Sequence, residues 1–437
     1  MPSPREPTLG ALARRVLRVA GVDAAYGAPG GGLDVVPAPP AVAPLLARAH
    51  GVVVGRAAAI CDAGGVVLIG GAADRADPVV VTGAAGLADV LPGLAAAAAG
   101  GPPAAVRLDL DPGGPAPAVP LPAPPPGPDR WQPLDDDVVA AVTAARRPVV
   151  LAGPGVVRAG CVPGLHGLAA AAHVGVLNTW GAKGVFDWRS RHHLATAGLQ
   201  ARDFALGGLA DADLIVATGV DGEVPDVAWR LAPAVEVPPA ALSWLSERWA
   251  RPAQEIPMPP LRTALAAVTQ AGWEAAGTPV APTRVTLAYS RALGAGGLVA
   301  APGGTAGYWI ARTFPTSVLG SVAVVEPDPP GLAVACAAVA RRRDPARAVL
   351  AVLDALDPAS AAVQEAAAAL GVAVPVHVWD AAGPDVAADD LEDRLVAAVQ
   401  AEQPVVERIA TAPEQLARMV EAAGAICAPG EPPYWVA

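Results

Sequence analysis

Residues 147–225 read RPVVLAGPGVVRAGCVPGLHGLAAAAHVGVLNTWGAKGVFDWRSRHHLATAGLQARDFALGGLADADLIVATGVDGEVP. An apolar run at 148–152 predicts a short buried strand. A glycine turn at 153–155 and a helical segment follow it, and a second strand is predicted at 174–179. A third helix–strand unit ends in DADLIVATGVD at 211–221. Strands that alternate with helices predict a parallel sheet covered by helices on both faces.

Length, charge and cysteine spacing limit the class of protein. Because 437 residues are too many for one core, we expect two or three domains. A net charge of −11 without a basic stripe argues against a nucleic-acid partner. The cysteines lie far apart and form no CxxC pair, so we expect reduced thiols, not disulfides or a zinc site. The apolar runs are too short for a bilayer and no signal pattern is present, so we expect a cytoplasmic protein without a membrane partner.

Two proline-rich segments divide the chain. Residues 113–130 are mostly Pro, Gly and Ala, which predicts an extended linker. A segment rich in Pro and Trp at 246–282 is predicted to be a second linker. The predicted domains are therefore an N-terminal domain at 1–112, a central domain at 131–245 and a C-terminal domain at 283–437.

Both outer domains also alternate strands and helices. Apolar runs predict strands at 66–69, 79–81, 105–110, 298–300, 322–325, 349–353 and 374–378. Helices are predicted at 8–20, 86–99, 360–370 and 389–400. The predicted fold class is α/β, with three consecutive domains that are each built on a parallel sheet.

Three motifs in the central stretch carry a family resemblance. The first, LAGPGVVRAG at 151–160, resembles a strand–loop–helix. The second, LNTWGAKGVFDW at 177–188, resembles a T-x-x-x-KG-x-F segment. The third, ADADLIVATGVD at 210–221, resembles an ADL-x-x-x-G strand. Together they resemble the central domain of thiamine diphosphate-dependent enzymes of the acetolactate synthase and benzoylformate decarboxylase type. The resemblance implies a pyrimidine-type N-terminal domain, a Rossmann-like central domain that can hold FAD or ADP, and a diphosphate-type C-terminal domain with magnesium.

The N-terminal domain resembles the family at its two ends only. GVDAAYGAPGGGL, within residues 20–33, resembles the family's start, and 86–112 resemble its last helix and strand. The segment between them is shortened, and it contains Arg48 and His50 but no Glu. In the family a Glu hydrogen-bonds the aminopyrimidine and promotes formation of the reactive ylid. We therefore predict poor cofactor activation and assign no catalytic residue.

Two other carboxylates of this domain are candidate substitutes for the missing Glu. Asp34 and Asp62 have the right chemistry, but neither stands at the family's spacing. The alternative for both is an ordinary solvated loop acid.

The C-terminal domain departs from the family at its magnesium motif. The family has a GDG turn after one strand and an Asn-Asn pair after the next. Here Asp354 lies near the first position and Asp380 near the second, so these two are the predicted metal ligands. Ala355 and Leu356 replace the glycines that let backbone amides approach a phosphate. Further upstream, Trp309 and Arg312 match the family's D-x-G-x-x-x-x-W-x-x-R segment.

The candidate cofactor-binding residues lie in the central domain. Gly153 and Gly155 could cradle a phosphate at a helix N-terminus, or they could simply form a tight strand–helix turn. Lys183 could face an FAD or ADP cleft, or it could be a surface lysine. Arg202, with Asp203 beside it, could contact an adenine nucleotide or form an ion pair. Asp221, at the end of the third strand unit, completes this set.

The resemblance and the departures together predict a family member with an eroded cofactor site. We expect a non-catalytic protein with a regulatory or binding role, whose ligand is a nucleotide or a 2-oxoacid. The alternative is an active thiamine diphosphate- and magnesium-dependent 2-oxoacid decarboxylase or carboligase with displaced ligands. Family members bind the cofactor between subunits, so the resemblance also implies a homodimer.

Overall fold

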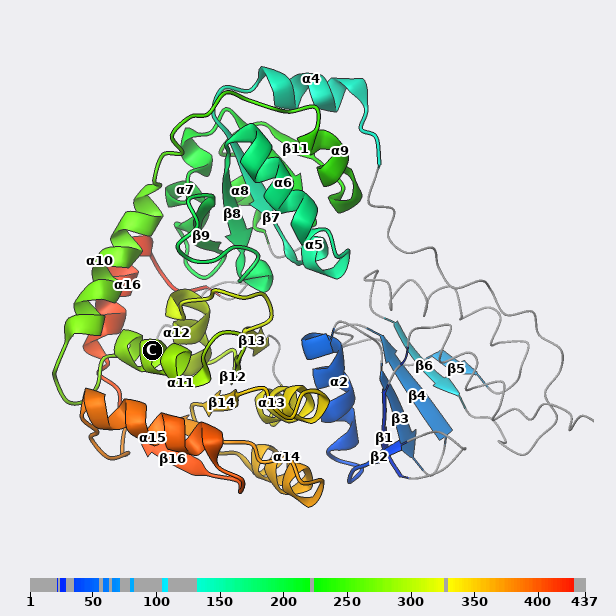
Figure 1. The fold of residues 1–437 in the computed structure, drawn as a ribbon, viewed down its shortest axis with the longest axis vertical. Coiled ribbons are helices and arrows are strands. Elements are labelled where there is room, and N and C mark those ends of the chain that lie inside the picture. The colour runs from blue at the N-terminus through cyan, green and yellow to red at the C-terminus, as the bar shows by residue number, and fades with distance from the viewer. Residues whose placement is uncertain are drawn as a thin grey trace, which may run out of the picture.

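The chain folds into three α/β units in series (Figure 1). The computed structural model describes residues 22, 24–28, 35–54, 58–62, 65–70, 79–81, 104–108, 132–220, 224–325 and 329–427. Each unit has its own sheet, one of six strands and two of five. The predicted three-domain α/β fold is thereby confirmed.

The central domain is a parallel sheet in the order β11-β10-β7-β8-β9. Its strands are β7 (Pro148–Ala152), β8 (Gly175–Thr179), β9 (His193–Ala197), β10 (Leu214–Thr218) and β11 (Ala234–Glu236). Its helices are α4 (Asp136–Ala144), α5 (Pro154–Arg158), α6 (Val162–Ala172), α7 (Asp203–Leu206), α8 (Asp226–Trp229) and α9 (Leu242–Ser246), with short turns η1 (Trp180–Ala182), η2 (Leu209–Asp211) and η3 (Pro239–Ala241). Strands β8 and β10 are buried along their whole length, which explains their continuous apolar runs.

The C-terminal domain is also wholly parallel, in the order β13-β12-β14-β15-β16. Its strands are β12 (Leu298–Pro302), β13 (Val322–Val325), β14 (Val349–Leu353), β15 (Val376–Trp379) and β16 (Val406–Ile409). Its helices are α11 (Pro282–Leu293), α12 (Thr305–Thr313), α13 (Leu332–Arg343), α14 (Pro358–Ala369), α15 (Ala388–Gln400) and α16 (Glu414–Ala423). The predicted strand at 374–378 begins two residues later, as β15.

The segment predicted as the second linker contains a helix, α10 (Pro260–Glu274). This helix packs against α11 and α16 of the C-terminal domain. It begins at Pro260, after Pro259 at the N-cap, and the first turn of a helix tolerates proline because the amides there have no partner within the helix.

The N-terminal sheet is mixed, in the order β2-β1-β3-β4-β6-β5, so the predicted parallel sheet is wrong for this domain. Its elements are β1 (Ala24–Gly27), β2 (Val35–Pro37), α2 (Ala43–Val54), β3 (Ala58–Asp62), β4 (Gly65–Gly70), β5 (Val79–Val81) and β6 (Ala104–Leu108). Strand β4 runs antiparallel to both of its neighbours. Two residues separate β3 from β4, and so short a connection joins only antiparallel strands. The predicted helices at 8–20 and 86–99, the linker at 113–130 and Asp34 lie outside the described residues.

Helix α13 is the contact between the N-terminal and C-terminal domains. It lies side by side with α2, and residues of both helices belong to one hydrophobic core (Figure 1). Residues 332–340 of α13 are all buried. A helix that is buried all round needs apolar residues on every face, and most of these are alanines that allow close approach. Among the helices of the described ranges, none is long and apolar enough to cross a membrane.

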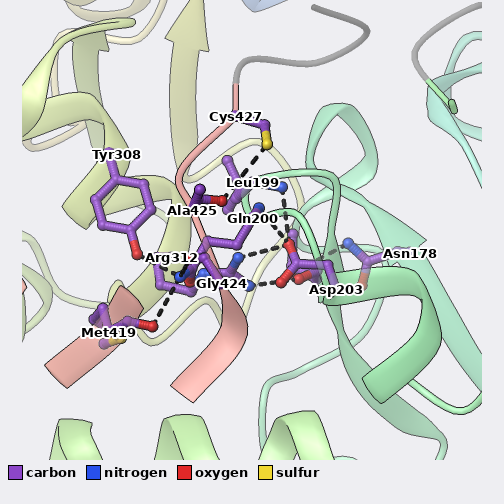
Figure 2. A network of polar contacts seen from close by, with 11 residues as sticks. Asn178, Leu199, Gln200, Asp203, Tyr308, Arg312, Met419, Gly424, Ala425 and Cys427 are labelled. Carbon is purple, nitrogen blue, oxygen red and sulfur yellow. Dashed lines mark hydrogen bonds and ion pairs between the residues drawn. The ribbon is translucent and has the colours of Figure 1, made fainter. Parts of the chain in front are cut away.

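A buried ion pair joins the central and C-terminal domains (Figure 2). Arg312 on α12 donates from Nη2 to Oδ2 of Asp203 at 2.6 Å and from Nη1 to the carbonyl of Thr196 at 2.9 Å. The two charged side chains are 1% and 0% exposed. Oδ2 of Asp203 also accepts the backbone amides of Leu199 and Gln200, both at 2.9 Å. These bonds offset part of the cost of removing both charges from water, and burial still raises the pKa of Asp203.

The chain after α16 is held to the same interface (Figure 2). Gln200 donates from Nε2 to the carbonyls of Met419 and Gly424, each at 2.8 Å. Its Oε1 accepts the hydroxyl of Tyr308 at 3.0 Å. One central-domain residue therefore binds two segments of the C-terminal domain that lie far apart in sequence.

Replacing Arg312 by methionine should destabilise the protein strongly, because Asp203 would be left buried without its cation. We expect the free energy of unfolding to fall by about 3–5 kcal/mol, as measured by urea denaturation. The matched control is Arg291→Met, which removes a half-exposed pair with Glu392 at 2.9 Å and should cost less than about 1 kcal/mol. Equal losses in the two variants would contradict the structural role given to Arg312.

Candidate functional site

The glycine turn after β7 is closed by backbone contacts. The amide of Gly153 donates to the carbonyl of Thr218 at 3.0 Å, and that of Gly155 donates to the carbonyl of Gly219 at 2.8 Å. A Cβ at residue 153 would lie 2.4 Å from the Gly219 oxygen, so the two loops approach too closely for any other residue. The predicted phosphate-binding amides therefore serve a tight strand–helix turn. Asp221 lies outside the described residues.

Arg202 also binds the protein itself. Its Nη2 donates to the carbonyl of Glu421 at 2.6 Å, and its backbone amide donates to the carbonyl of Ala423. It makes no pair with Asp203, whose carboxylate pairs with Arg312. Arg202 thus fastens the end of α16 to the central domain.

Asp354 follows β14 and fixes the start of α12. Its Oδ1 accepts the amide of Ala306 at 2.9 Å, and the amide of Thr305 also hydrogen-bonds the carboxylate. Burial raises the pKa of Asp354, and these two hydrogen bonds oppose the shift. The carboxylate stands in for the N-terminal cap that α12 lacks, since residue 304 is glycine.

Asp380 follows the neighbouring strand β15 and pairs with a cation. Its Oδ2 accepts from Nη1 of Arg408 at 2.9 Å, and its Oδ1 accepts the amide of Ala382 at 2.9 Å. Within the described ranges no three His, Cys, Asp or Glu side chains are grouped so as to hold a metal. Asp354 and Asp380 are thus each engaged by donors of the protein itself.

Lys183 lies where the three domains meet. It follows η1, and Gly184 after it has a φ of +94°, which lets the chain turn away. Lys183 lines a cavity of about 170 Å³. The other lining residues come from all three domains: Val52 and Val53 of α2; Trp180 and Gly181 of the central domain; and Leu298, Ala311, Gly320, Val322, Ala323 and Val324 of the C-terminal domain.

The Lys183 amine is poorly solvated. Part of the residue is exposed, yet burial of the ammonium lowers its pKa to about 7, and the nearby Arg312 adds to the shift. The pKa of His193 is lowered to about 3, by burial first and then by the charges of Lys183 and Arg262. In the described part of the chain, no hydrogen bond or ion pair is made by the Lys183 ammonium. The sequence pointed to Lys183 itself but not to its neighbours in the other two domains.

Replacing Lys183 by methionine should stabilise the fold, because it keeps the apolar stem and removes a charge that burial disfavours. The unfolded chain holds this proton up to the ordinary pKa of 10.5, whereas the folded chain releases it near 7. The buried charge therefore destabilises the folded protein to its full extent below about pH 7. This destabilisation shrinks as the pH rises and disappears near pH 10.5.

Scanning calorimetry of both proteins across this range measures the effect. We expect the methionine variant to unfold several degrees higher at pH 7, with a gain that shrinks steadily toward pH 10. A variant that unfolds below the wild type at every pH would show that Lys183 stabilises the fold instead.

Comparisons with known proteins agree with this architecture. Residues 136–235 match the family model described as thiamine pyrophosphate enzyme, central domain. Of the solved structures that match, one is an X-ray structure of a candidate thiamin diphosphate-dependent enzyme from Mycobacterium smegmatis. The two sequences are 16% identical, and the match covers 93% of this chain and 100% of that chain. The TM-score of 0.63 shows that the folds are similar. The comparison with curated proteins gave no match. Residues 136–235 therefore match the central domain of thiamine pyrophosphate enzymes, and the three-domain fold is similar to that of the mycobacterial structure.

Proposed function

We propose that this superfamily member is a pseudoenzyme with respect to thiamine diphosphate and works as a binding or regulatory protein. The observation that carries the proposal is that both predicted magnesium ligands already have partners within the protein. Asp354 accepts first-turn amides of α12, and Asp380 pairs with Arg408.

The chemistry of magnesium supports this reading. Mg²⁺ needs a near-octahedral set of oxygen ligands and usually takes one or two carboxylates together with substrate phosphates. The guanidinium of Arg408 competes with a cation for the carboxylate of Asp380. Ala355 and Leu356 also stand where a phosphate would need close backbone amides. A divalent cation would thus have to displace Arg408 and detach the start of α12.

The likeness to the family also implies a nucleotide or a 2-oxoacid as a ligand, and these two classes are not equally well supported. The amides of the glycine turn are engaged, which counts against a phosphate of FAD or ADP at that loop. A small ligand has a better position in the cavity beside Lys183, where three domains contribute the wall. A homodimer and a cytoplasmic location remain part of the proposal by likeness to the family.

Isothermal titration of the full-length protein with thiamine diphosphate, with and without Mg²⁺, tests the proposal. We expect no magnesium-dependent binding heat and no CO₂ release from pyruvate. Tight one-to-one binding that requires Mg²⁺ would refute the proposal and favour the alternative of an active decarboxylase or carboligase with displaced ligands.

The variant Asp354→Ala separates the two roles of this carboxylate. If it only anchors α12, the variant should lose about 1 kcal/mol of unfolding free energy and leave the response to Mg²⁺ unchanged. Loss of a magnesium response that the wild type shows would instead assign Asp354 to the metal.

A further inference from the structure

Lys183 is the only lysine in the chain, which has 29 arginines. The two side chains are not equivalent, because a guanidinium stays charged at every accessible pH, whereas an ammonium can lose its proton when it is desolvated. A position that required only a positive charge could carry arginine. Apart from the histidines, every other basic position of the chain does carry arginine. The single lysine therefore points to a role for its amine rather than for its charge.

The surroundings of the amine agree with such a role. Among the described residues, the cavity beside Lys183 is lined otherwise by apolar side chains, glycines and Trp180, and none of these lining residues is a carboxylate. An ammonium usually draws a carboxylate or carbonyl partner, and here none is present within the described residues. In the same wall, Trp180 has a buried Nε1 without a hydrogen-bond acceptor. The wall thus leaves polar groups without protein partners around a space of about 170 Å³.

We propose that the Lys183 amine captures a small aliphatic aldehyde or ketone in this cavity as an imine. The nitrogen lone pair attacks the carbonyl carbon and forms a carbinolamine, and a proton moves from nitrogen to oxygen. The hydroxyl then leaves as one water molecule together with the second proton of the nitrogen, and a carbon–nitrogen double bond forms. Addition of water reverses the sequence, so no oxidant, reductant or further reactant is needed.

The charges around the amine favour its neutral, nucleophilic form. Burial lowers the pKa of Lys183 to about 7, so about half of the amines are neutral at pH 7, against roughly one in 2,500 for a lysine of ordinary pKa. Arg312 on α12 stays charged beside Asp203 and repels a second cation. His193 on β9 is neutral, because its pKa lies near 3. The lining residues of α2, β12 and β13 carry no charge. Lysines in apolar pockets or beside another cation are activated nucleophiles.

This inference does not depend on the proposed function. Imine formation needs neither thiamine diphosphate nor magnesium, so the titration described above can fail or succeed without deciding it. A protein that binds thiamine diphosphate and also forms the imine would refute the proposed function alone.

Reductive trapping tests the inference on the full-length native protein. The protein is incubated with propanal and sodium cyanoborohydride, and the propylated residues are located by peptide mass spectrometry. We expect a Lys183 adduct whose rate saturates with propanal and rises with pH around a midpoint near 7. At pH 7 it should form at least about tenfold faster than in the urea-unfolded chain, where the amine has its ordinary pKa. The α-amino group, the remaining primary amine, is the internal reference.

Three variants sharpen the test. Lys183→Met and Lys183→Arg should both lose the adduct at this position while the α-amino group reacts as before. Val53→Phe keeps the lysine but fills the cavity from α2, and it should slow the Lys183 adduct at least fivefold. Circular dichroism verifies that each variant is folded.

The outcome that overturns the inference is equally specific. A Lys183 adduct that forms no faster in the native protein than in the unfolded chain would overturn it. So would a rate that grows linearly with propanal or is unchanged by Val53→Phe.

Discussion

The buried contact between Arg312 and Asp203 governs how the two larger domains meet. Neither charge reaches water, so the guanidinium must keep its carboxylate, and the carboxylate must keep the amides of Leu199 and Gln200. This requirement fixes α12 against the end of β9. It also places a permanent positive charge next to the space that Lys183 occupies, and the low pKa of that amine follows in part from the same contact.

The cofactor chemistry of the superfamily depends on groups that are engaged differently here. Asp354 and Asp380 stand at the ends of neighbouring strands, where ligands of open α/β sheets commonly bind. Yet one carboxylate holds the start of a helix and the other pairs with an arginine. The chain has thus kept the arrangement of domains and uses its strand ends for structure. The cavity beside Lys183 is a separate space, and its lining among the described residues includes no Asp, Glu, His or Cys.

Much of the fold could be predicted from local sequence, whereas most of the site could not. The strands β7, β13 and β14 match the predicted ranges because each is a short apolar run bounded by turn residues. Prolines within 246–282 favour a linker, yet Pro259 and Pro260 stand at the N-terminus of helix α10, where proline is tolerated. The partners of the candidate site residues lie far away in sequence: Asp354 binds an amide 48 residues earlier, and Asp380 an arginine 28 residues later. No periodicity or spacing reports such contacts. The sequence did hold one overlooked signal, the solitary lysine among arginines.

Because the chain has a single lysine, the state of its amine can be measured without interference from any other. Protein grown with lysine labelled with ¹³C at Cε should give one lysine resonance, and its chemical shift can be followed as the pH is raised. We expect a titration midpoint near 7 in the folded protein, which moves above 10 when urea unfolds the chain. A midpoint above 10 in the folded protein would show that the amine is solvated and charged at neutral pH, which would contradict the account.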